Sequence, residues 1–212
     1  MVKKIEVLVA DDHELIRSGI KHILEDTEDI EVSAEAADGI LAVQVARKNT
    51  WDIGILDVNM PNRNGIETLV ILKKEFPRRP ILLLSMHPEE QYAVRAIENG
   101  ASGYITKQSA SLELVKAIRY VAGGGKYITP TVAERLAGAM GNKNKPTADR
   151  LSNRELQVLM LIAAGKPLTQ VGDLLSLSVS TVSIYRRRIL DKLELDNTGA
   201  LIRFGIENGL VK

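Results

Sequence analysis

The sequence predicts a flavodoxin-like α/β domain, with a doubly wound parallel sheet of five strands, followed by a small all-α domain. Five short apolar segments alternate with five segments in which apolar residues recur at helical spacing. The segments at 53–56 and 81–84 are continuously apolar, as is typical of strands that helices cover on both faces. Residues 151–212 contain four helical patterns and no strand pattern.

The expected elements alternate strictly through the first 125 residues. Strands are expected at 5–10, 30–36, 53–57, 80–85 and 101–106. A helical pattern follows each strand, at 15–24, from 38, from 65, at 89–99 and at 112–122. This alternation favours a parallel sheet between two layers of helices.

Composition narrows the class of protein. Apolar residues make up 45% of the chain and charged residues 26%, as in a soluble globular protein of one or two domains. The absence of cysteine excludes disulfides and cysteine-based metal sites or nucleophiles. No apolar run is long enough to span a bilayer and the N-terminus does not resemble a signal peptide, so we expect no membrane association and a cytoplasmic location.

Polar residues stand at the carboxyl ends of the predicted strands. Asp11 and Asp12 follow the first strand, Asp57 ends the third, Ser85 ends the fourth, and Lys107 follows the fifth. Because parallel strands point the same way, we expect these side chains to meet in one crevice. Each residue alone fits a helix cap, a loop cap or a solvated charge, and the set of five is what indicates a site.

The chemistry of the set favours phosphoryl transfer. Three converging carboxylates repel one another unless a cation lies among them, and an all-oxygen cluster with Asn59 in the same loop suits Mg²⁺. A metal ion, the Lys107 ammonium and the Ser85 hydroxyl are the groups that the oxygens of a transferring phosphoryl group require. Asp57 is the expected nucleophile, because carboxylates form acyl phosphates.

These residues resemble, in their order, the receiver domain of two-component response regulators. The likeness extends to Met60-Pro61 after the nucleophile strand and to the run Gly-Ala-Ser-Gly-Tyr-Ile-Thr-Lys at 100–107. It covers about residues 2–125. The resemblance implies that Asp57 accepts a phosphoryl group from a histidine kinase.

The resemblance also implies roles for the neighbouring residues. The ligands of Mg²⁺ would be Asp11, Asp12, Asp57 and the main-chain carbonyl of Asn59. Lys107 would pair with the phosphoryl oxygens, while Ser85 and Tyr104 would move as a coupled switch. A hydroxyl drawn toward the phosphoryl group vacates space into which an aromatic ring can turn. Met86 follows the switch serine, where the family more often has a small residue.

A hinge is expected between the two domains. Thr129 is the expected N-cap and Pro130 the first residue of a short helix. Residues 141–147 are polar, contain Gly and Pro and lack periodicity, which indicates a flexible linker. The predicted organisation is a domain at 1–125, a linker with a short helix at 126–150, and a second domain at 151–212.

The second domain is predicted to hold four short helices. Ser152 and Glu155 have the spacing of a capping box at the start of the first. The second is expected at 168–175, the third from Ser180 as its N-cap to about Leu193, and the fourth from Thr198.

The third helix of this domain has two contrasting faces. Its apolar face consists of Val182, Tyr185, Ile189 and Leu193. Its opposite face is centred on Ile184, Arg187 and Asp191, with Ser183 and Arg188 at the margins. A helix that follows a short turn and carries basic side chains outward suits the major groove of DNA. The arginine run alone would equally suit a solvated surface helix.

The surrounding sequence, from Leu151-Ser152-Asn153-Arg154-Glu155 to Lys192-Leu193, is similar to the LuxR-type helix-turn-helix domain. Both halves together resemble a NarL/FixJ-type response regulator. The resemblance implies base contacts from Ser183, Ile184 and Arg187, with Arg187 the best candidate for a guanine contact. It implies phosphate contacts from Ser180, Thr181 and Arg188. Ser183 stands where the family commonly has Lys, and Tyr185 where it often has His, so the operator sequence is not carried over.

The predicted function is a transcription regulator, not an enzyme, that binds promoter DNA as a homodimer once Asp57 is phosphorylated. Three alternatives stay open at this point. An aspartyl-phosphate phosphohydrolase uses a similar set, but it usually needs a second Asp where this chain has Asn59. The second domain could bind protein in place of DNA, and phosphorylation could be vestigial.

Overall fold

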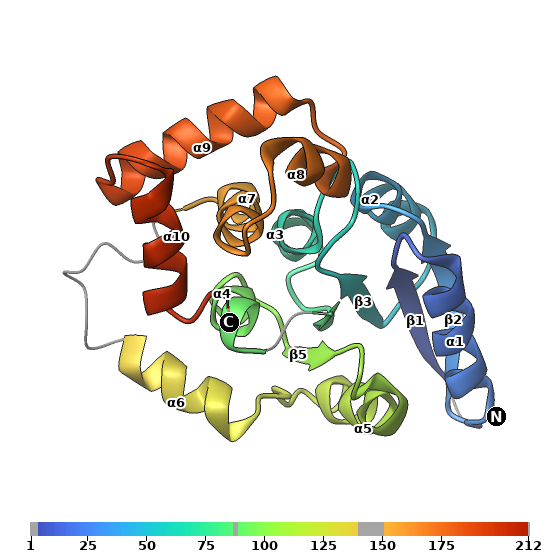
Figure 1. Cartoon of the computed structure of the whole chain (residues 1–212). Helices are drawn as coiled ribbons and strands as arrows, with labels where there is room; N and C mark the ends of the chain where they lie inside the picture. Colours follow the sequence, from blue (N-terminus) through green and yellow to red (C-terminus); the bar gives the residue numbers. More distant parts are fainter. Residues whose placement is uncertain (1–3, 87–88, 140–150, 212) are drawn as a thin grey trace. The chain divides into compact units, whose positions relative to one another are not determined.

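The computed structural model divides into two compact units, Met1–Ala139 and Met140–Lys212 (Figure 1). It describes residues 4–86, 89–139 and 151–211. The predicted flexible linker at 141–147 lies outside the described residues. No helix in the described part of the chain is long and apolar enough to cross a membrane.

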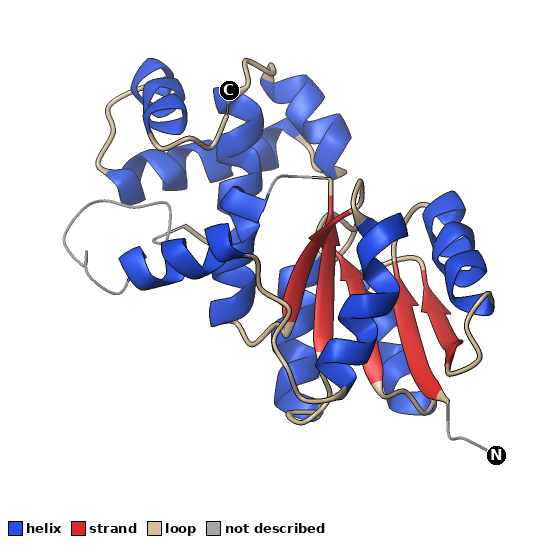
Figure 2. Cartoon of the chain, turned by 90° about the horizontal axis from the view of Figure 1, so that it is seen from below, coloured by secondary structure: helices blue, strands red, loops and turns tan. Residues whose placement is uncertain are grey.

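The first unit is built on a five-stranded parallel sheet (Figure 2). Its strands are β1 (Ile5–Ala10), β2 (Ile30–Ala36), β3 (Ile53–Asp57), β4 (Ile81–Ser85) and β5 (Gly103–Thr106). The spatial order is β2-β1-β3-β4-β5, and every neighbouring pair is parallel. The order reverses direction between β1 and β3, which places a crevice at their carboxyl ends. The predicted fold class is confirmed.

Helices connect the strands and cover both faces of the sheet. They are α1 (Glu14–Glu25), α2 (Gly39–Lys48), α3 (Gly65–Glu75), α4 (Glu89–Glu98) and α5 (Ala110–Ala122). The predicted start of α5 is two residues late. The predicted fifth strand begins two residues early, because the Ala101 N–H still bonds the Ala96 carbonyl and completes the end of α4.

Aliphatic side chains on one face of the sheet pack against α1 and α5. The strands contribute residues such as Val7, Ile55 and Leu84, and the two helices contribute residues such as Leu24 and Leu114. The alternate strand positions, among them Leu8, Leu56 and Leu83, are also fully buried. Burial on both faces explains why these strands are continuously apolar, and it fixes the strand ends that carry the polar residues.

The chain after α5 returns to the sheet. The Tyr127 N–H donates to the Ser102 carbonyl at 2.7 Å, and Tyr127 pairs with Gly103 as an isolated parallel bridge. Helix α6 (Pro130–Ala139) then contacts α4, and Val132 is buried. The predicted start of this helix is confirmed: Thr129 Oγ1 accepts from the Val132 N–H at 3.4 Å. The segment 126–139 therefore packs with the first unit, while the predicted domain boundary at 125 stays a prediction.

The second unit contains four helices in its described part. They are α7 (Asn153–Ala163), α8 (Leu168–Leu175), α9 (Val179–Leu193) and α10 (Thr198–Glu207). The capping box of Ser152 and Glu155 is confirmed, with both reciprocal bonds present. Helix α7 contacts the other three helices, so it forms the centre of this unit.

The predicted cap of α9 was wrong. Ser178, not Ser180, is the N-cap: its backbone is extended and its side chain accepts from the Thr181 N–H at 3.1 Å. The Ser178 carbonyl also accepts the first helical bond, from Val182. Ser180 lies within the first turn, where its hydroxyl meets that of Ser178 at 2.8 Å. Several closely spaced hydroxyl residues can serve as the cap, and the backbone bond from Val182 identifies Ser178 as the one used.

Glu155 links the first turn of α7 to the C-terminal half of α9. Its carboxylate accepts from the Ser152 N–H at 2.6 Å and from Lys192 Nζ at 2.7 Å, and its side chain is 3% exposed. Burial raises the pKa of Glu155, but the bonds from Lys192 and Ser152 outweigh burial and hold the pKa below its ordinary value. The charged carboxylate therefore stabilises the second unit.

We expect Glu155→Gln to destabilise the second unit by about 1–3 kcal/mol at neutral pH, because charge-assisted hydrogen bonds are lost. Since the pKa is lowered by folding, this contribution is present above the ordinary Glu pKa and is lost as pH falls through the lowered value. Hydrogen exchange of the α7 and α9 amides measures the effect. Glu207→Gln, at an exposed position on α10, is the control. Unchanged exchange in Glu155→Gln would contradict the expectation.

Candidate functional site

The carboxyl ends of β1, β3, β4 and β5 bring a buried polar cluster together. Asp11, Asp57 and Ser85 are at most 2% exposed. Lys107 Nζ lies 2.6 Å from Asp11 Oδ2 and 2.9 Å from Asp57 Oδ2, so one ammonium joins two buried carboxylates. The backbone N–H of Lys107 also donates to the Ser85 carbonyl at 2.8 Å, which fixes the backbone of the lysine to the end of β4. The structure thus brings together four of the predicted residues.

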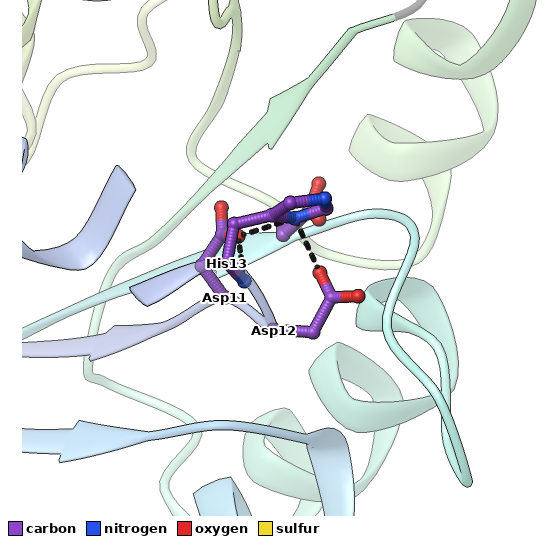
Figure 3. Close-up of side chains that lie close together, drawn as sticks. Asp11, Asp12 and His13 are labelled. Carbon is purple, nitrogen blue, oxygen red and sulfur yellow. Dashed lines mark hydrogen bonds and ion pairs between the residues drawn. The ribbon is translucent and has the colours of Figure 1, made fainter. Parts of the chain in front are cut away.

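The opening of this cluster carries Asp12 and a histidine (Figure 3). The Asp12 side chain is 31% exposed. His13 Nδ1 lies 2.8 Å from Asp12 Oδ1 and 3.2 Å from Asp11 Oδ1, and the His13 N–H donates to Asp11 Oδ1 at 2.9 Å. His13 was absent from the predicted site. Its only sequence signal was its place directly after the two aspartates.

Burial and charge set the electrostatics of the cluster. Burial raises the pKa of Asp57 to about 6; Lys107 opposes this rise, and the neighbouring Asp11 adds to it. Burial lowers the pKa of Lys107, but Asp57 and Asp11 outweigh burial and raise it above its ordinary value. The Lys107 ammonium is therefore held in its charged form. Ionisation of the buried Asp57 carboxyl is unfavourable, and a further cation nearby would favour the ionised form.

The donor atoms suit a divalent cation. Carboxylate oxygens of Asp11, Asp12 and Asp57, and a ring nitrogen of His13, all lie within 4.8 Å of one another. Mg²⁺ prefers oxygen ligands and takes few carboxylates, so the three aspartates fit it. Asn59, also a predicted ligand, is half-buried in the loop after β3, where its backbone bonds the Asp57 carboxylate.

The loop that follows Asp57 is held close to it by Gly65. The Gly65 N–H donates to the Val58 carbonyl at 3.0 Å. A Cβ at position 65 would lie 2.1 Å from the Asp57 carbonyl oxygen, which no side chain permits. Asn64 caps α3 through its side chain and is itself buried. The N-terminus of α3 is thereby packed against the strand end that presents Asp57.

The two predicted switch residues lie on neighbouring strands. Tyr104 in β5 is paired with Leu83, two residues before Ser85 in β4, so both side chains stand on the same face of the sheet. Tyr104 is 3% exposed, which places its ring inside the molecule. Met86, which follows the serine, is 63% exposed and points to solvent.

Helix α9 presents a polar, basic surface. Ser180, Arg187 and Arg188 are exposed, and Ile184 is 53% exposed; Thr181 and Ser183 are half-buried. The opposite face is confirmed as apolar, because Val182, Ile189 and Leu193 are buried. Arg186 is distinct from its two neighbours: it is half-buried and its Nη1 lies 3.5 Å from Thr198 Oγ1 on α10.

Sequence comparison assigns a family to both units. Residues 7–119 match the family described as "Response regulator receiver domain", and residues 149–204 match "Bacterial regulatory proteins, luxR family". The chain belongs to the response regulators. Members of this family are transcription regulators rather than enzymes, and the predicted class of protein is confirmed.

Relatives align with this response regulator over nearly their full length. Response regulator UvrY of Escherichia coli is 36% identical over 97% of the chain and 95% of the relative. Response regulator GacA of Pseudomonas aeruginosa is 34% identical over 98% of each. Transcriptional regulatory protein MctR of Rhizobium johnstonii is 33% identical over 98% of the chain and 96% of the relative.

Solved structures of RcsB from Salmonella typhimurium have a similar fold. One, described as showing conformational dynamism for DNA interaction, matches with a TM-score of 0.69 and 26% identity, over 98% of this chain and 99% of RcsB. Another, bound to promoter rprA in the presence of the phosphomimetic BeF3⁻, matches with a TM-score of 0.65 and 27% identity, over 95% and 98%.

Proposed function

We propose that this response regulator accepts a phosphoryl group on Asp57 from a histidine kinase and then binds promoter DNA as a homodimer. The observation that carries the proposal is the Lys107 ammonium placed between two buried carboxylates, with a third aspartate at the opening. Burial raises the pKa of Asp57 to about 6, so its ionised carboxylate gains from an added cation. Family membership supports both halves of the proposal, and the cytoplasm is the expected location.

The chemical step transfers phosphorus between two side chains. An Asp57 oxygen attacks the phosphorus of a phosphohistidine; the new P–O bond forms, the P–N bond breaks, and the electron pair stays on the imidazole, which takes up a proton. Lys107 pairs with the phosphoryl oxygens, and the Ser85 hydroxyl donates to one of them. Asp11, Asp12, Asp57 and the Asn59 carbonyl would hold Mg²⁺, which would supply positive charge against the phosphoryl oxygens.

The response then passes to the β4–β5 region. Ser85 and Tyr104 stand on one face of adjacent strands, and α4 and α6 follow from there in contact with each other. Movement of Ser85 toward the phosphoryl group changes the space beside Tyr104. We infer that this shifts an equilibrium between states that differ in dimerisation, rather than creating a new state.

DNA is bound through α9. Ser183, Ile184 and Arg187 face bases, while Ser180, Thr181 and Arg188 approach phosphates. Arg187 is exposed, and its guanidinium can donate two hydrogen bonds to the acceptors of one guanine. A single small module with so few base contacts binds weakly, so two modules act on half-sites about one helical turn apart. The working division of the chain is a receiver at 1–125, a linker at 126–150 and a DNA-binding domain at 151–212.

The test is selection from a pool of promoter DNA by the full chain, with and without acetyl phosphate and Mg²⁺. We expect sequence-selective binding that strengthens on phosphorylation, and no strengthening in Asp57→Ala. Arg187→Ala should weaken selected binding by about tenfold or more, corresponding to the loss of a bidentate base contact. Arg203→Ala, at an exposed position on α10, is the matched control.

Each failure has a distinct meaning. Equal binding with and without acetyl phosphate would contradict control by Asp57 and leave a DNA-binding protein. Binding that Arg187→Ala leaves unchanged would remove α9 from the interface. No DNA binding under any condition would leave the second unit as a protein-binding module.

A further inference from the structure

His13 faces the acidic pocket rather than the helix that it precedes. It is the N-cap residue of α1, with an extended backbone, yet its side chain makes no capping bond to that helix. The His13 N–H is instead bonded to Asp11 Oδ1, which anchors the residue to the pocket wall. Figure 3 shows the ring turned toward both aspartates, and the dashed contacts join it to each.

The His13 ring nitrogen lies at the spacing of neighbouring metal ligands from an oxygen of Asp11 and from an oxygen of Asp12. In an octahedral complex with bonds of about 2.1 Å, neighbouring ligand atoms lie about 3.0 Å apart. His13 Nδ1 lies 2.8 Å from Asp12 Oδ1 and 3.2 Å from Asp11 Oδ1. A cation placed between these atoms can therefore bind the ring nitrogen and both carboxylates with small movements. Asp57 supplies a further oxygen within 4.8 Å.

Lys107 does not compete for this position. Its ammonium contacts Asp11 through Oδ2, whereas His13 contacts Asp11 through Oδ1. The two oxygens of one buried carboxylate thus face two different partners, Lys107 and His13. The His13 side chain is 65% exposed, so an ion can enter from solvent without displacing the lysine.

We propose that His13 makes this pocket a mixed carboxylate–imidazole site that binds Co²⁺, Ni²⁺ or Zn²⁺ through the imidazole, in a mode that Mg²⁺ does not use. Imidazole is a good ligand for these ions, whereas Mg²⁺ takes oxygen ligands and water. The same aspartates bind Mg²⁺ and the ions that take imidazole, so binding of one ion excludes the other. The inference rests on the proposed metal pocket of the receiver and adds a second class of metal and a new ligand.

The expected consequence is a selective effect of His13 on metal affinity. Replacing His13 by asparagine removes the ring nitrogen and keeps the backbone N–H that holds Asp11. We expect Co²⁺ to bind His13→Asn about tenfold or more weaker than wild type. Mg²⁺ affinity should change less than about twofold, because Mg²⁺ keeps its oxygen ligands. Wild-type protein should bind Co²⁺ more tightly than Mg²⁺.

The experiment is calorimetric titration of untagged full-length protein with Co²⁺ and with Mg²⁺ separately, supported by the visible absorption of bound Co²⁺. His22→Asn, an exposed histidine on α1, is the matched control and should behave as wild type. Mg²⁺ should displace bound Co²⁺ from wild type, which shows that the two share one site.

The outcomes separate this inference from the proposed function. Equal Co²⁺ affinity in His13→Asn and wild type would show that the imidazole is not a ligand. Equal losses of Co²⁺ and Mg²⁺ affinity in His13→Asn would also overturn the inference, because they would mean that His13 only positions the aspartates. Wild type that binds Mg²⁺ but not Co²⁺ would overturn the inference alone. Wild type that binds neither ion would overturn the metal pocket itself, and the inference with it.

Discussion

Replacing Lys107 with methionine should lower the free energy of unfolding of the metal-free first unit by about 3–5 kcal/mol at neutral pH, the cost of breaking a buried ion pair from one side. The ammonium lies 2.6 Å and 2.9 Å from two carboxylates that are themselves buried. Without it, two negative charges face each other with little water. Urea unfolding followed by fluorescence of Trp51, the single and fully buried tryptophan, measures this unit.

The loss should shrink under conditions that remove the uncompensated charge. Lower pH protonates the carboxylates, and Mg²⁺ replaces the missing cation, so either should restore part of the stability. Lys116→Met, at an exposed position on α5, controls for the change of side chain and should leave the unfolding curve unchanged. A Lys107→Met protein as stable as the Lys116→Met protein would show that the ion pairs contribute nothing.

Replacing Asp57 with asparagine should instead raise the free energy of unfolding of the metal-free protein. Burial raises the pKa of Asp57 to about 6 in the folded chain, from an ordinary value of 3.8. The folded state therefore holds its proton more tightly than the unfolded state, and the ionised carboxylate opposes folding. The loss of folding stability caused by the ionised Asp57 carboxylate is nil below the ordinary pKa and grows as pH rises toward the folded pKa. It reaches about 3 kcal/mol above the folded pKa.

Asp57→Asn should thus stabilise the metal-free protein by up to about 3 kcal/mol at pH values well above 6, and by little near pH 4. Urea unfolding of wild type and Asp57→Asn across this pH range, with a chelator present, gives the free energy of unfolding of each protein as a function of pH. Added Mg²⁺ should narrow or reverse the difference, because the wild-type carboxylate binds the ion and the amide does not. A constant difference between the two proteins at every pH would contradict the assignment of the effect to ionisation of Asp57.

Much of the fold could be predicted because its signals are local. The buried strands β3 and β4 are recognisable as short apolar runs, and parallel topology then gathers Asp11, Asp57 and Lys107 at one end of the sheet without any knowledge of long-range contacts. The same holds for the capping box at Ser152, which lies within four residues of sequence.

Other features depend on contacts that sequence periodicity does not encode. The choice of Ser178 over Ser180 as the cap of α9 was decided by which carbonyl accepts the first helical bond. The orientation of His13 follows from its bonds to Asp11 and Asp12, which one chain position cannot reveal. The link from Glu155 to Lys192 spans two helices. In each case the sequence allows several local arrangements, and only the bonds of the folded chain distinguish them.

The return of the chain to β5 through Tyr127 has a consequence for self-recognition. β5 is an edge strand, and such strands offer unpaired backbone groups to any extended segment that approaches, including one from another molecule. Here the Ser102 carbonyl is taken by Tyr127, and α6 lies beyond it against α4. The predicted site residues end at Lys107, yet the chain that pairs with the edge of the sheet extends to Tyr127. The segment after α5 therefore occupies part of the backbone edge of β5 to which a strand from another molecule would add.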